Sequence, residues 1–137
     1  MTARPELILR RLSNTFRNPT QSPNTSNSLD FYSTSEQVLL RRTAQPVSLD
    51  FMLIIPPGYH MEMRSHGWLS ARGIIAVPKI IDSTYRTRVI MTLINTSDAD
   101  YRLELNRPLV SGVIYQDMLP EIMIRTYYTD EGIDISD

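Results

Sequence analysis

The chain contains no cysteine and only two histidines, His60 and His66. The absence of cysteine excludes disulfide frameworks, thiolate zinc sites and a cysteine nucleophile. The two histidines lie six positions apart, with no acidic pair at ligand spacing near them. We therefore expect no metal site built on protein ligands alone.

A strong charge of one sign and a long apolar run are also missing. Fourteen basic residues against fifteen acidic residues give a formal net charge of -1, which argues against an electrostatic nucleic-acid binder. No apolar run approaches the roughly 20 residues that cross a bilayer, and the first residues lack the apolar core of a signal peptide. We expect a soluble, intracellular protein with no membrane partner and no nucleic-acid partner for its core domain.

What the chain has is enough material for one domain. Its 137 residues are 42% hydrophobic, and nine prolines accompany apolar residues in short β-branched runs, which argues against a helical bundle and against disorder. Apolar and polar residues alternate with a period of two in several stretches, as in half-buried strands. We expect strands at 47–55, 59–64, 74–77, 86–95, 101–105, 109–116 and 121–128. Short strands at this spacing predict an all-β, jelly-roll-like domain.

The first 28 residues differ from the rest in charge and pattern, with four arginines against one glutamate. Four apolar residues recur at helical spacing: Ile8, Leu9, Leu12 and Phe16. This spacing predicts a short amphipathic helix over 6–17, followed by a polar, proline-interrupted linker. The segment is either a solvated tail or an extended arm that docks on a neighbouring subunit or a partner protein. The residues expected to make that contact are Arg10, Arg11, Leu12 and Phe16.

The charge pattern divides the chain into three parts. The basic arm covers 1–28, the β domain covers 29–128, and an acidic tail covers 129–137.

An ordered set of short motifs lies in the β domain. In chain order they are Leu29–Ser33, Ile55–Tyr59, Arg64–Ser65, Gly73–Ile74, Ile80–Arg86 and Leu93–Asp98. The set, centred on Ile-Asp-x-x-Tyr-Arg, resembles the trimeric dUTPase family in order and spacing over roughly residues 28–116. The resemblance implies a distorted β-barrel, a homotrimer and, in an active member, hydrolysis of dUTP to dUMP and pyrophosphate with Mg²⁺.

The resemblance also implies roles for five residues. Asp82 would be the carboxylate that orients or deprotonates the attacking water, and Tyr85 would close against the deoxyribose. Arg64 and Ser65 would donate to phosphate oxygens, a task that suits a guanidinium fork and a hydroxyl. Asp30 would lie near the Mg²⁺–triphosphate as a hard oxygen ligand acting through water.

The chain departs from the family pattern at several positions. The glycines expected before Ile-Asp are replaced by Ala76–Lys79, where Pro78 removes an amide donor. His66 follows Arg64–Ser65 where the family has Gly or Ser, and no glutamine occurs near the fourth motif until Gln116. The glycine-rich segment that closes over the phosphates has no counterpart, and the acidic C-terminus would repel a triphosphate.

These departures lead us to predict a catalytically inactive, degenerate member of the family. It would resemble virus-encoded dUTPase-derived proteins, such as those of adenoviruses, and would act as a homotrimeric structural or protein-interaction module. The arm would attach it to a host factor or to a larger viral assembly as a minor or decoration protein. If the protein is viral, we expect it in the host-cell cytoplasm or nucleus, or in the virion. The alternative is a dUTP diphosphatase, and only in that case do we expect a cofactor, Mg²⁺.

Three of the five candidate site residues also have an ordinary structural explanation. Asp82 is in a sequence where aspartates cap turn amides, and Tyr85 could simply pack at the start of a strand. Arg64 could form a surface ion pair of small net value. These structural explanations are alternatives to the catalytic and binding roles.

Overall fold

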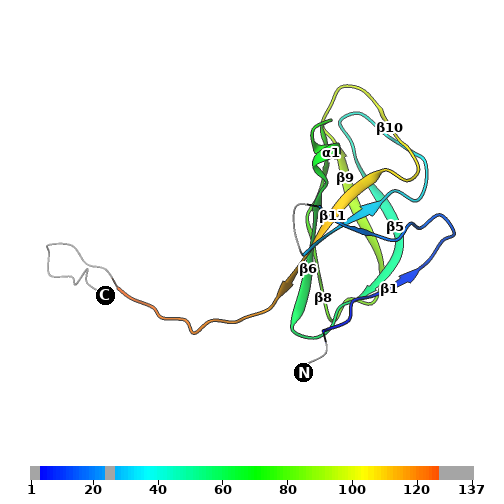
Figure 1. Cartoon of the computed structure of the whole chain (residues 1–137). Coiled ribbons are helices and arrows are strands. Elements are labelled where there is room, and N and C mark those ends of the chain that lie inside the picture. Colours follow the sequence, from blue (N-terminus) through cyan, green and yellow to red (C-terminus); the bar gives the residue numbers. More distant parts are fainter. Residues whose placement is uncertain (1–3, 24–26, 127–137) are drawn as a thin grey trace, which may run out of the picture.

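The computed structural model describes residues 4–23 and 27–126 and is nearly all-β (Figure 1). Strands make up 49% of it and helix 3%, the latter being the single turn α1 (Gly67–Ser70). The predicted fold class is therefore confirmed. Among the described residues, no helix is long and apolar enough to cross a membrane.

Two antiparallel sheets form the body of the molecule, together with a small two-stranded sheet. The five-stranded sheet has the order β2 (Thr20–Gln21), β3 (Ser28–Tyr32), β11 (Pro108–Gln116), β6 (Tyr59–Ser65) and β8 (Lys79–Asp82). The four-stranded sheet has the order β1 (Ile8–Arg11), β5 (Ala44–Ile54), β9 (Arg88–Asn95) and β7 (Ile74–Ala76). The two-stranded sheet pairs β10 (Tyr101–Leu103) with β4 (Gln37–Leu39).

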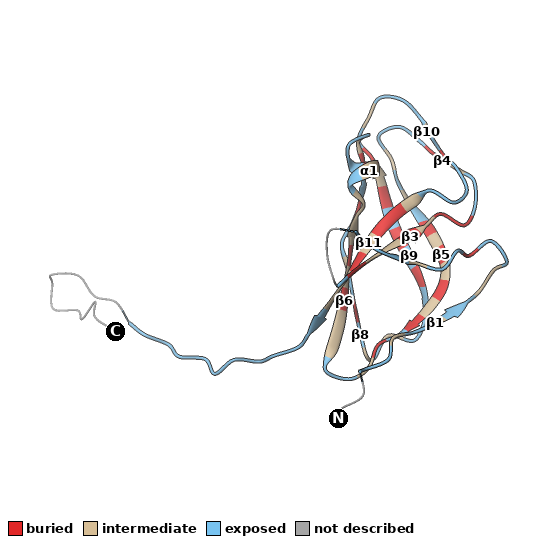
Figure 2. Ribbon diagram, in the orientation of Figure 1, coloured by how far each residue is buried: buried red, intermediate tan, exposed pale blue. Residues whose placement is uncertain are grey.

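The core lies between the two large sheets, as the buried stretches of the facing strands show (Figure 2). Phe31 of β3 stacks on Phe51 of β5 with ring centroids 4.9 Å apart and an interplanar angle of 6°. Met61 and Met63 of β6 and Ile81 of β8 are fully buried. Because side chains alternate along a strand, burying these residues turns their neighbours toward the outside.

Residues 8–11 form a strand, so the predicted helix over 6–17 is wrong. β1 pairs antiparallel with β5 from Ile8 opposite Ile54 to Arg11 opposite Phe51. A free helix of about a dozen residues is marginal in water, whereas the edge of β5 offers a full ladder of backbone partners. Tertiary pairing therefore overrides the helical spacing.

The segment after β1 packs into the core. Phe16 is 6% exposed, and its ring centroid lies 5.5 Å from that of Phe51. Leu12 donates its backbone N–H to Asp50 O at 2.9 Å, and Arg11 donates from Nη2 to Phe16 O at 3.0 Å. The residues expected to contact a partner thus include three that are bound into this chain's own fold.

The chain beyond β11 forms no strand within the described residues, so the strand predicted at 121–128 is wrong for 121–126. This segment runs away from the body (Figure 1) and all of it is exposed. Within residues 4–23 and 27–126, no strand pairs with this segment, so its alternation forms no ladder. The predicted acidic tail at 129–137 lies outside the described residues, and the division of the chain at 28 and 128 stays a prediction.

We expect Phe16→Ala to lower the free energy of unfolding by about 3–5 kcal/mol, because it empties a buried aromatic position. Urea unfolding at one fixed protein concentration measures the loss. Asn14→Ala, at an exposed position two residues away, is the control and should change stability by no more than about 0.5 kcal/mol. Equal stability of the two variants would show that this segment is a detachable arm.

Candidate functional site

Polar side chains collect on the outer face of the five-stranded sheet, the face turned away from the four-stranded sheet. In β6, the burial of Met61 and Met63 turns the residues between and beside them outward. The strand registers place the outward residues in rows across the sheet. One row contains Asp30, Ser111 and Arg64, and another contains Tyr115, His60 and Asp82.

Asp30 is held from two sides in the first row. Ser111 Oγ donates to Asp30 Oδ1 at 3.3 Å, and His66 Nε2 lies 3.5 Å from Asp30 Oδ2. The side chains of Asp30 and His66 are 17% and 21% exposed. Asp30 therefore offers a fixed carboxylate at a half-buried place on the outer face.

Arg64 stands on the other side of Ser111 and reaches toward the second row. Its Nη2 donates to the Tyr115 hydroxyl at 2.9 Å and lies 3.3 Å from Glu62 Oε1. Within residues 4–23 and 27–126, Arg64 Nε is the one buried side-chain nitrogen or oxygen without a hydrogen-bond partner. The Arg64 side chain as a whole is 43% exposed, so the outer part of its guanidinium can donate to an acceptor such as a phosphate oxygen.

Strand alternation turns the Ser65 side chain away from the outer face that carries Asp30 and Arg64. Its hydroxyl donates to Ala76 O at 3.3 Å and accepts from Ala76 N–H at 2.8 Å. These bonds tie β6 to β7, and they use the one proton that the hydroxyl can donate.

Asp82 ends β8 with an exposed side chain that caps the following turn. Its Oδ1 accepts from Thr84 Oγ1 at 2.6 Å and from Thr84 N–H at 2.9 Å. These bonds favour the charged form, so the Thr84 side chain first and its backbone N–H second lower the pKa of Asp82. The turn-capping explanation thus describes its geometry, and the same geometry keeps an accessible carboxylate ionised.

Tyr85 lies in the turn between β8 and β9, which belong to different sheets. Its hydroxyl donates to Arg88 O at 2.9 Å. Lys79 Nζ lies 5.3 Å from the centroid of the Tyr85 ring and donates to Ile90 O at 3.0 Å. Tyr85 and Lys79 therefore each donate to a backbone carbonyl of β9.

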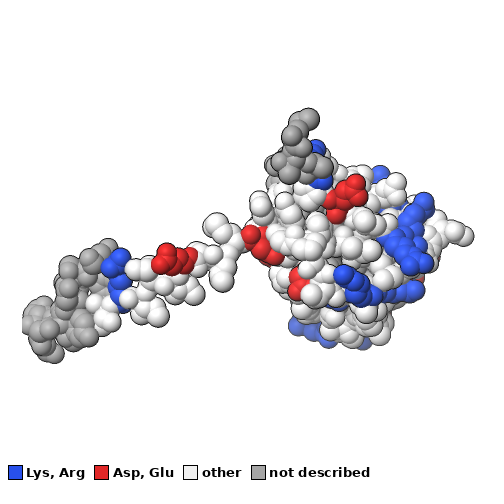
Figure 3. All heavy atoms as spheres, turned by 90° about the horizontal axis from the view of Figure 1, so that it is seen from below, with Lys and Arg blue, Asp and Glu red and all other residues white. Residues whose placement is uncertain are grey.

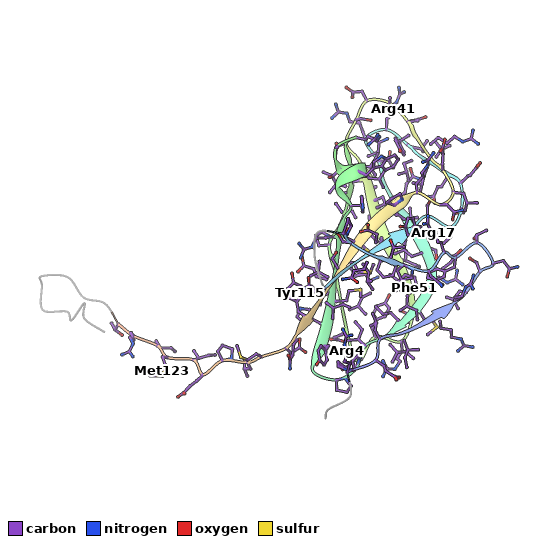
Figure 4. The ribbon with its side chains drawn as sticks, viewed as in Figure 1. Arg4, Arg17, Arg41, Phe51, Tyr115 and Met123 are labelled. Carbon is purple, nitrogen blue, oxygen red and sulfur yellow. The ribbon has the colours of Figure 1, made fainter. Side chains whose placement is uncertain are left out.

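A cavity of about 570 Å³ opens beside the second row, where β11 ends and the chain leaves the body. Figure 4 labels Tyr115 at this place. The lining residues are His60, Glu62, Tyr115, Gln116, Asp117, Met118 and Leu119. His60 stacks on Tyr115 with centroids 5.2 Å apart, and its Nδ1 lies 2.5 Å from Asp117 Oδ1. Since β6 separates β8 from β11, the backbones of Asp82 and Tyr115 are about 10 Å apart.

The sequence did not indicate that Ser111, His60 and Tyr115 are neighbours of the candidate residues. Their alternation within β6 and β11 is visible in the sequence, but their opposition across strands depends on the register.

No group of three or more His, Cys, Asp or Glu side chains could hold a metal ion among the described residues. Asp30 is the candidate carboxylate for a cation that brings most of its own ligands, as Mg²⁺ does with water and phosphate oxygens.

The four residues expected to contact a partner come together only in part. Arg10 is exposed and pairs in register with Met52, which also pairs with Arg88 of β9. Figure 3 shows that Lys and Arg side chains gather on one side of the body in that view. Phe16 is buried, so it does not share that surface.

Residues 14–108 match the family model described as dUTPase. The chain is 35% identical over 85 residues to the deoxyuridine 5'-triphosphate nucleotidohydrolase of Brucella melitensis biotype 1, a match that covers 60% of this chain and 53% of that protein. It is 23% identical over 101 residues to the Helicobacter pylori protein of the same name, covering 72% of this chain and 70% of that one. The match to the Brucella relatives therefore spans about half of their length.

Solved structures of phage dUTPases share the fold. The dUTPase of Staphylococcus bacteriophage 80alpha superposes with a TM-score of 0.76 at 19% identity, covering 91% of this chain and 99% of that chain. The dUTPase of phage phi11 of S. aureus gives a TM-score of 0.74 at 20% identity, with the same coverage.

These findings contradict our prediction of an inactive structural or interaction module, including its viral decoration role. The curated relatives are named as nucleotidohydrolases, and one of the phage proteins is described by its enzymatic activity. The departures at 76–79 lie before the turn and at the start of β8. They do not remove Asp82, which stays exposed and ionised at the end of β8.

We expect Thr84→Val to raise the pKa of Asp82 relative to the unsubstituted chain, because it removes the hydroxyl that contributes most to the lowering. The Thr84 N–H bond remains, so part of the lowering should persist. A ¹³C NMR titration of the Asp82 carboxyl measures the change. Thr87→Val, at an exposed position in the same turn, should leave this pKa unchanged, and an unchanged pKa in Thr84→Val would refute the assigned cause.

Proposed function

Because the chain belongs to the dUTPase family, we propose that it hydrolyses dUTP to dUMP and pyrophosphate. The observation that carries the proposal is the exposed Asp82 carboxylate, whose pKa is lowered by Thr84 and which ends β8 at the start of the Ile-Asp-x-x-Tyr-Arg turn. Asp82, Tyr85, Arg64, Ser65 and Asp30 all fall inside the matched residues 14–108. The relatives' names support the substrate, as dUTP nucleotidohydrolases.

Asp82 would act on the water that attacks the α-phosphate. A carboxylate can orient that water, or accept its proton, when it lies within hydrogen-bond reach of it. Thr84 holds the carboxylate through Oδ1, and the exposed position of Asp82 leaves the group accessible to a water. The resemblance gives Tyr85 the deoxyribose side of the same site, and its ring is held by the bond to Arg88 O.

Arg64 would hold the triphosphate. Phosphoryl transfer depends mostly on positioning and on stabilising charge, and the partly exposed guanidinium of Arg64 is suited to this task. Glu62, 3.3 Å from the guanidinium, keeps Arg64 paired until a phosphate oxygen competes for it. Ser65 would have to give up its bond to Ala76 O to donate to phosphate.

The residues present fit a Mg²⁺ ion that is bound largely through the substrate. Asp30 supplies one fixed carboxylate, and Mg²⁺ commonly takes one or two carboxylates together with phosphates and waters. The ion would neutralise charge on the triphosphate when bound. The phi11 phage dUTPase has a structure described as revealing coordination of a structural Mg(II) ion.

We propose a homotrimer as the assembly. Leu119 and Ile124 are each 89% exposed, and Met118, Ile122 and Met123 extend this apolar segment. Apolar surface of this extent is uncommon on a monomer, so a neighbouring copy of the chain is the expected cover.

We expect the purified protein to release pyrophosphate from dUTP with Mg²⁺, and Asp82→Asn to reduce turnover at least about 100-fold, as loss of a general base does. A coupled pyrophosphate assay measures both. Glu36→Gln, which removes an exposed carboxylate paired with Arg102, should keep full activity. The proposal fails if the unsubstituted protein shows no turnover, or if Asp82→Asn retains it.

We expect light scattering at micromolar concentration to give three times the 15.8 kDa chain mass. Replacing Ile122 and Ile124 together by Glu places charge on the exposed apolar segment and should shift the mass toward that of one chain. Glu121→Gln, directly before these positions in the same exposed segment, should leave the trimer intact. A monomer in the unsubstituted protein would contradict this assembly.

A further inference from the structure

We propose that His66 is a positioning residue for the proposed reaction: it holds the Asp30 carboxylate in the orientation that receives the Mg²⁺–triphosphate. The inference rests on the proposed function, and it concerns a residue that follows Arg64–Ser65 directly in the chain.

His66 bridges α1 and Asp30 through its two ring nitrogens. It is the N-cap residue of α1 with extended backbone angles, φ -77° and ψ 135°, and its Nδ1 accepts the Trp68 N–H at 3.1 Å. Its Nε2 lies 3.5 Å from Asp30 Oδ2. One ring therefore connects the start of the helical turn to the carboxylate.

The bond from Trp68 fixes which nitrogen carries the proton. A backbone N–H can only donate, so Nδ1 must accept, and a neutral imidazole then has its proton on Nε2. Nε2 lies 3.5 Å from Asp30 Oδ2, at the long limit of a hydrogen bond. A donor at this place orients the carboxylate and leaves its negative charge available for a cation.

Ser111 completes the arrangement from the other side. Its hydroxyl donates to Asp30 Oδ1, so β11 and the end of β6 each hold one oxygen of the carboxylate. Each oxygen has further lone pairs, which remain for water or a bound ion. Groups that orient a ligating carboxylate in this way typically change metal affinity 10–100-fold when they are removed.

Capping alone does not account for the choice of histidine. Serine and asparagine are preferred N-caps, and either would satisfy the Trp68 N–H. Neither side chain is long enough to replace the imidazole at Asp30. A capping role alone would not need a side chain that reaches as far as Asp30, and the imidazole does reach it.

The test separates the cap from the contact with Asp30 by using His66→Ser and His66→Asn, which both keep a cap. Calorimetric titration of the full-length protein with the non-hydrolysable analogue dUpNHpp, with and without Mg²⁺, gives the readout. We expect both variants to lose affinity about tenfold or more with Mg²⁺ and to match the unsubstituted protein without it, at an unchanged urea midpoint. His66→Gln, which restores an N–H donor on a longer side chain, should recover part of the loss.

A double variant and a spectrum complete the test. In an Asp30→Asn background, His66→Ser should have no further effect on the Mg²⁺-dependent affinity. The ¹⁵N spectrum of the unsubstituted protein should show the tautomer of His66 in which Nδ1 is the acceptor and Nε2 carries the proton. Equal Mg²⁺-dependent affinity in His66→Ser and the unsubstituted protein would overturn the inference and leave the function intact. Absence of any dUpNHpp binding by the unsubstituted protein would overturn the proposed function and this inference with it.

Discussion

The close contact of β11 with the side chains beneath it is the constraint on which the site depends. A Cβ placed on Gly112 would lie 2.6 Å from Met61 Sδ and 2.9 Å from Phe31 Cε2. Only glycine lets β11 lie over both side chains, between β3 and β6. A shift of one residue in either register would turn every side chain to the opposite face, so this contact also fixes which residues face outward.

The register of these strands determines which side chains lie together on the outer face of the sheet. Asp30, Ser111 and Arg64 come from three strands that are far apart in sequence, yet they form one row because Gly112 and its buried neighbours set the pairing. Phe16, in the segment after β1, supports the same core, since its ring contacts Phe51 of β5, which stacks on Phe31. The N-terminal segment therefore contributes to the stability of the sheet that carries the site.

The sequence predicted the parts of this protein that depend on local pattern. Alternation indicated β5, β6, β9 and β11, and the Ile-Asp-x-x-Tyr-Arg motif indicated Asp82, because a strand period and a turn aspartate need no distant partner. The prediction for 8–11 was wrong because its apolar spacing suits a helix as well as a strand. Pairing with the edge of β5 makes this segment a strand. Ser111 and His66 were not recognised because their roles arise from cross-strand register and from one ring that spans two elements. The roles of the five candidate residues stay predictions until they are measured.

The central claim is that a water held by Asp82 attacks the α-phosphorus of dUTP. Hydrolysis in ¹⁸O-labelled water, followed by mass spectrometry of both products, tests this claim directly. The account predicts one ¹⁸O atom in dUMP and none in pyrophosphate. Label in pyrophosphate, which would place the attack on the β-phosphorus, or a complete absence of hydrolysis would contradict it.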